Sequence, residues 1–162
     1  MCFGLLASKS HAETLTPFVV AQGEGGGAFH GETISYQVTL TGETIVEMYM
    51  DVKTARQYAN KVTQSDAEQI AWFVSALAVS KISPQAGTYL SFIGLMNGIQ
   101  RGHIASDVRK YTDKNKKVKV TCYISPTPLG KPAANYTVTS WDGKIVTKSG
   151  VKGIRDLHIT YY

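Results

Sequence analysis

An almost uncharged stretch of 32 residues lies in the middle of the chain, from residue 69 to residue 100. Lys81 is its single charged residue, and its second half runs into three glycines spaced four positions apart, Gly94, Gly98 and Gly102. An apolar segment of this length has to be buried in a protein core or in a membrane. This stretch therefore constrains the fold more than any other part of the sequence.

Capping residues divide the central region into helices. Asp51 predicts the start of a short helix over residues 52–62. Ser65 and Glu68 form an S-x-x-E capping box that predicts a second helix to about residue 80. Ser83 followed by Pro84 predicts a third helix, which we expect to continue without a break to about residue 111.

The second and third helices are predicted to form an apolar helical hairpin. A glycine inside a helix costs about 1 kcal/mol relative to alanine, so three of them on one face require a compensating contact. Small residues at every fourth position allow two helix backbones to approach closely. We therefore expect two small-residue faces to meet, formed by Gly94, Gly98, Gly102, Ala67, Ala71 and Ser75.

The hairpin has two interpretations. Its arms give roughly 15 and 21 Å of helix, against a hydrocarbon core of about 30 Å, so ordinary membrane spanning is disfavoured. In the first interpretation the hairpin is only core. In the second it leaves the domain and enters a membrane, as the glycine-rich hairpins of pore-forming and bacteriocin-like peptides do. The sequence resembles those peptides in style alone, and no family is assigned.

Strand patterns flank the helices. Residues 32–40 and 44–50 are predicted to form a hairpin through Thr41–Glu43, and residues 117–124 alternate as a strand. Asp142 and Gly143 predict the turn of another hairpin over residues 135–150, and residues 155–162 a last strand. The order predicts one α+β domain over residues 32–162, with the helical hairpin and a short helix packed on a mainly antiparallel β-sheet.

The first residues suggest export. Residues 1–12 resemble the end of a signal peptide, with a short apolar run and Ser10 to Ala12 as a cleavage site, and residues 13–31 form a flexible glycine-rich segment. We expect the protein to be secreted or held at the cell envelope. Cleavage would leave Cys122 as the single cysteine and no internal disulfide.

Basic residues are concentrated late in the chain. The net charge is +5, but residues 1–100 carry −3 (5 basic, 8 acidic) and residues 101–162 carry +8 (12 basic, 4 acidic). Such asymmetry predicts an anionic partner, here anionic lipid or a cell-envelope polymer, although a solvated lysine-rich loop has the same pattern. The predicted anion-binding residues are Arg101, Arg109, Lys110, Lys114, Lys116, Lys117 and Lys119.

Catalytic and metal-binding patterns are sparse. His103 and Asp107 share a helix face but form half a metal site at most. Cys122 and His158 could form a thiolate–imidazole pair if their strands are neighbours, although a buried cysteine is the simpler interpretation. His30 and Glu32 could act as acid and base, or be ordinary loop residues. We expect no metal and no cofactor.

Nucleic-acid binding is a weaker alternative. Stacking surfaces on the sheet could come from Tyr111, Tyr123, Tyr136 and Trp141. The export signal and the lack of a nucleic-acid-binding motif argue against it.

The sequence predicts an exported bacterial protein that is non-enzymatic. Its glycine-lined hairpin and basic segment would contact anionic envelope or membrane surfaces, which could give it antimicrobial activity. One alternative is an extracellular or cell-envelope binding module whose hairpin is only core. A further alternative is a hydrolase that uses Cys122.

Overall fold

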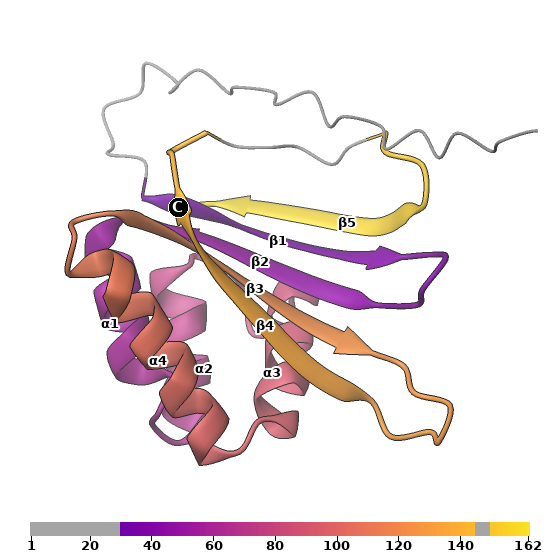
Figure 1. Ribbon diagram of the computed structural model, residues 1–162. Helices are drawn as coiled ribbons and strands as arrows, with labels where there is room; N and C mark the ends of the chain where they lie inside the picture. The colour runs from indigo at the N-terminus through magenta and orange to yellow at the C-terminus, as the bar shows by residue number, and fades with distance from the viewer. Residues whose placement is uncertain (1–29, 145–149) are drawn as a thin grey trace, which may run out of the picture.

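The computed structural model describes residues 30–144 and 150–162. The predicted signal peptide, most of the glycine-rich segment and part of the second predicted hairpin (residues 145–149) lie outside the described residues. Figure 1 shows the strands in one layer and the helices in another. In chain order the elements are β1 (Gly31–Val38), β2 (Thr44–Met50), α1 (Val52–Lys61), α2 (Asp66–Ala76), α3 (Pro84–Leu95), α4 (Gly98–Thr112), β3 (Lys117–Ser125), β4 (Ala133–Trp141) and β5 (Ile154–Tyr161).

The five strands form one antiparallel sheet in the order β4-β3-β2-β1-β5. The predicted hairpin of β1 and β2 is present, and β5 returns to pair with β1 at the edge opposite β4. All four helices lie against the same face of the sheet (Figure 1). The predicted α+β class is confirmed.

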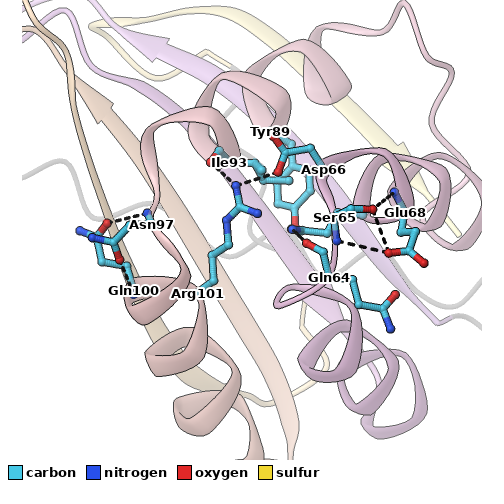
Figure 2. Close-up of polar contacts among 10 residues, drawn as sticks. Gln64, Ser65, Asp66, Glu68, Tyr89, Ile93, Asn97, Gln100 and Arg101 are labelled. Atoms are coloured by element: carbon cyan, nitrogen blue, oxygen red, sulfur yellow. Dashed lines mark hydrogen bonds and ion pairs between the residues drawn. The ribbon is translucent and has the colours of Figure 1, made fainter.

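The helices begin where the capping residues indicate. The Asp51 side chain accepts a hydrogen bond from the Thr54 amide at 2.7 Å, and Ser65 and Glu68 form the reciprocal capping box of α2 (Figure 2). These bonds satisfy amides that the first helical turn leaves without partners. α2 ends at Ala76, earlier than expected, and the chain turns at Ala78, whose φ is 51°.

The predicted third helix is in fact two helices. α3 ends at Leu95, and α4 begins at Gly98 after an extended Asn97 with φ −81° and ψ 171°. Asn97 and Gln100 form a second capping box, with hydrogen bonds of 2.9 and 3.0 Å (Figure 2). The prediction of one helix to residue 111 is therefore wrong, because these two side chains stabilise a new helix start.

The predicted small-residue contact is also wrong. A Cβ atom added to Gly94, Gly98 or Gly102 would meet nothing within 4 Å. The residues proposed to face them, Ala67, Ala71 and Ser75, are exposed. Aromatic side chains make the α2–α3 contact instead: the rings of Phe73 and Tyr89 stack with their centroids 4.4 Å apart. The hairpin is held by large buried rings, so its glycines do not bring two backbones together.

Gly102→Ala is expected to raise the free energy of unfolding by about 0.5–1 kcal/mol. The added methyl group has open space, and alanine loses less backbone entropy than glycine in a helix interior. Urea denaturation measures the change. Ala105→Gly, at a buried position of the same helix, should lower stability. A marked loss in Gly102→Ala would mean that the glycine does pack closely.

Buried side chains form one cluster on each side of the sheet. The larger cluster fills the space between helices and sheet and includes Tyr58, Phe73 and Tyr89. The smaller one lies on the face that points away from the helices, and its members are Ile34, Tyr36, Ile45, Tyr49 and Trp141. This second face also carries the polar groups described next.

Candidate anion-binding site

A buried carboxylate on β2 organises the sheet face that points away from the helices. Glu47 is 2% exposed and accepts hydrogen bonds from the hydroxyls of Tyr36, at 3.2 Å, and Tyr49, at 2.9 Å. The Lys119 ammonium on β3 lies 3.2 Å from the same carboxylate. Burial and the neighbouring Glu47 charge raise the pKa values of both tyrosines, so their hydroxyls stay protonated and act as donors.

Glu32 is a second buried acid on this face. It lies opposite Tyr49 in the β1–β2 register and is fully buried. Neither of its carboxylate oxygens has a hydrogen-bond partner in the described part of the chain. Burial and then the Glu47 charge raise its pKa to about 8, while Lys119 acts in the opposite direction. Glu32 therefore keeps its proton at pH 7.

A recess opens at the end of the sheet where β3 begins and β4 ends. Its volume is about 670 Å³. It is lined by four lysines, two aromatic rings and three shorter polar residues: Lys116, Lys117, Lys119, Lys144, Tyr49, Trp141, Asn115, Ser140 and Asp142. We call it the lysine recess. Lys119 is already paired with Glu47, and the ammonium groups of Lys116, Lys117 and Lys144 against the Asp142 carboxylate give the recess a positive charge.

The aromatic rings form the base of the lysine recess. Tyr49 and Trp141 meet edge to face with centroids 5.6 Å apart. The Lys117 ammonium lies 5.5 Å from the centroid of Trp141, and that of Lys119 lies 5.0 Å from the centroid of Tyr49. Cation–π contacts of this kind orient the lysine side chains. Two of the four lysines are therefore held against the rings.

The turn after β4 positions the fourth lysine. Trp141 donates from Nε1 to the Lys144 carbonyl at 2.7 Å, and the Lys144 amide donates to Asp142 Oδ1 at 2.9 Å. These two bonds close the Asp142–Lys144 turn against the indole ring. Lys144 and Asn115 were not among the residues predicted from the sequence.

The structure separates the seven predicted cations into two groups. Arg101 bonds Asp66 at 2.8 Å and the Ile93 carbonyl at 2.7 Å, which ties α4 to α2 and α3 (Figure 2). Arg109 donates to the Ala59 carbonyl at 3.1 Å. These arginines hold helices together. The five lysines form the second group: Lys110 lies at the end of α4, Lys114 and Lys116 in the turn that follows, and Lys117 and Lys119 on β3.

Lys110 is engaged by a neighbouring acid. Its ammonium lies 2.7 Å from Asp107, and it holds the pKa of that carboxyl below its usual range. Lys116, Lys117 and Lys119 line the lysine recess, so three of the predicted anion-binding residues come together there.

The catalytic candidates do not assemble. Cys122 is buried on β3, where burial raises the pKa of its thiol, and two strands separate it from His158 on β5. His30 bonds Asp51 at 2.9 Å, and Glu32 is fully buried. Within residues 30–144 and 150–162, no group of three or more His, Cys, Asp or Glu side chains could hold a metal ion.

Comparison with known proteins gives no lead to the function. No family model, curated protein or solved structure matches this chain. The described helices also include none with both the length and the apolar character needed to cross a bilayer.

The sequence carried further signals of the site. Lys117 and Lys119, both predicted, are two positions apart in an alternating strand, which places them on one face. Glu47 is an acid between apolar neighbours in a strand that is otherwise nearly uncharged, a pattern that indicates a paired buried charge. That Trp141 lies beside Lys117 depends on the β3–β4 register, which no local pattern fixes.

Proposed function

We propose that the protein is a non-enzymatic binding module that holds an anionic cell-envelope polymer in the lysine recess. The observation that carries the proposal is the convergence of Lys116, Lys117, Lys119 and Lys144 on one recess. Ammonium groups in a concave site attract and hold anionic groups. Secretion or attachment to the envelope belongs to the same proposal and rests on the sequence.

The short helices and their buried core residues favour a binding module over a membrane-inserting hairpin. α3 and α4 have 12 and 15 residues, or about 18 and 22 Å of helix. Their buried residues, including Tyr89, Phe92 and Ile104, belong to the core between helices and sheet. Insertion would expose that core and lose its burial energy. We therefore favour the alternative in which the hairpin is only core.

Neutralising the lysine recess is expected to abolish most anion binding. In the variant Lys117→Gln with Lys144→Gln, the affinity for inorganic triphosphate at low salt should fall about tenfold or more, because charge-assisted hydrogen bonds contribute about 1.5–3 kcal/mol each. Titration calorimetry measures the affinity. The parent protein should also lose affinity as salt is added.

The matched control removes the same charge elsewhere. Lys53→Gln with Lys81→Gln neutralises two exposed lysines outside the recess and should leave binding unchanged. Equal losses in both variants would point to net charge alone and contradict the proposal. The proposal would also be contradicted if the protein bound anionic vesicles and the Lys117→Gln, Lys144→Gln variant bound them equally well. That result would favour a membrane surface as the partner.

A further inference from the structure

A second recess adjoins the lysine recess. It has a volume of about 410 Å³ and is lined by Asp107, Lys110, Tyr111, Lys114, Lys116 and Val138. Lys116 lines both recesses. The second recess lies between the end of α4 and the middle of β4, where the Tyr111 hydroxyl donates to the Val138 carbonyl at 3.5 Å. The two recesses therefore share one lysine at the end of the sheet, with Tyr49 and Trp141 of the first on the face away from the helices and Tyr111 and Val138 of the second on the helix side.

We infer that the two recesses form a single track for a linear polymer of phosphate groups. This inference rests on the proposed function and narrows its ligand class. Lys117, Lys119 and Lys144 line the first recess, Lys116 joins the two, and Lys114 lies in the second. Within the described residues, no carboxylate lies within salt-bridge distance of Lys114 or Lys116. Their positive charges are therefore available to a ligand.

The distribution of these charges favours a long ligand. One compact anion can fill one recess and leaves the cations of the other unused. A chain with repeated charges can contact both recesses at once, and each contact after the first is intramolecular. Affinity should therefore grow with chain length until the ligand spans the track.

The aromatic rings argue for phosphate groups without bases. Single-stranded nucleic acids gain affinity when bases stack on open aromatic faces. Trp141 is 7% exposed and Tyr49 is 3% exposed, and lysine ammonium groups lie over both rings. These rings leave bases no surface for stacking. Apart from the Asp142 carboxylate, which accepts the Lys144 amide in the turn, the recess contacts left for a ligand are ammonium, amide and hydroxyl groups, which suit phosphate oxygens.

Inorganic polyphosphate of graded length tests the inference, with full-length protein and titration calorimetry at low salt. The parent should bind long-chain polyphosphate more tightly than triphosphate. Lys114→Gln, in the second recess, should weaken long-chain binding by about fivefold, the loss expected for one cation near a charged surface, and leave triphosphate binding unchanged. Lys117→Gln should weaken both.

The outcomes separate this inference from the proposed function. The track is wrong if affinity does not depend on chain length. It is also wrong if Lys114→Gln leaves long-chain binding intact while Lys117→Gln reduces triphosphate binding. In both cases the proposed anion-binding module still stands. If Lys117→Gln changes neither ligand's binding, the proposed function fails too. Tighter binding of an oligothymidine than of polyphosphate with equal charge would overturn the choice of a base-free polymer. Lys53→Gln, at an exposed lysine that lines neither recess, is the control and should leave the binding of both ligands unchanged.

Discussion

Glu32→Gln is expected to stabilise the protein by about 3–5 kcal/mol at pH 8 and to change its stability little near pH 4.5. The pKa of Glu32 rises from an ordinary value of 4.5 to about 8 in the folded protein. Each unit of pKa difference corresponds to about 1.4 kcal/mol of folding free energy. This is the largest effect that we expect from one polar side chain.

The sign follows from the protons bound in each state. Between pH 4.5 and pH 8 the unfolded chain releases the Glu32 proton and the folded protein keeps it. The folded state then binds more protons than the unfolded state, so the stability of the parent falls as pH rises through this window and levels off above about pH 8. Glutamine cannot ionise, so the variant loses this dependence.

Urea denaturation at pH 5 and pH 8 measures the effect. Asp113→Asn, which removes a negative charge from an exposed residue at the end of α4, is the control and should leave the pH dependence of stability intact. If Glu32→Gln and the parent have the same stability at pH 8, the Glu32 carboxyl does not keep its proton in the folded state.

Phe73→Ala should lower the free energy of unfolding by about 3–5 kcal/mol, the range for removing a buried aromatic ring. Phe73 is fully buried and stacks on Tyr89, so the change removes both the ring and the contact that joins α2 to α3. Thermal or urea denaturation measures the loss.

Ala71→Leu provides the matched comparison on the same helix. Ala71 is exposed, so the larger side chain should change stability by less than about 0.5 kcal/mol. A large loss for Ala71→Leu together with a small loss for Phe73→Ala would favour the small-residue contact over the aromatic one.

Local patterns predicted the elements well and their contacts poorly. Asp51, Ser65 and Ser83 each mark a helix start, because capping needs only neighbours in the sequence. Asn97 and Gln100 carried the same kind of signal, N-x-x-Q, but it lay inside an apolar run and was interpreted as continuous helix. The apolar residues on both sides of Asn97 predicted one continuous helix, so the break between α3 and α4 was missed.

Contacts between elements depend on positions that the sequence does not show. The glycine spacing predicted a close helix contact, yet buried rings at Phe73 and Tyr89 make the α2–α3 contact. The lysine recess needed the register that brings Trp141 beside Lys117 and Tyr49 beside Lys119. The alternation in β3 predicts that the lysines share one face. It does not predict which aromatic rings on the neighbouring strands lie against them.

The place of β5 beside β1 has a consequence for synthesis. The side chains of Gln37 and Arg155 bond at 2.7 Å although 118 positions separate them. A chain that emerges amino end first completes β1 long before its outer neighbour exists, so the sheet cannot close while most of the protein is being made. The sheet is therefore expected to form completely only once residues 154–161 have left the ribosome, and until then the outer edge of β1 lacks its strand partner.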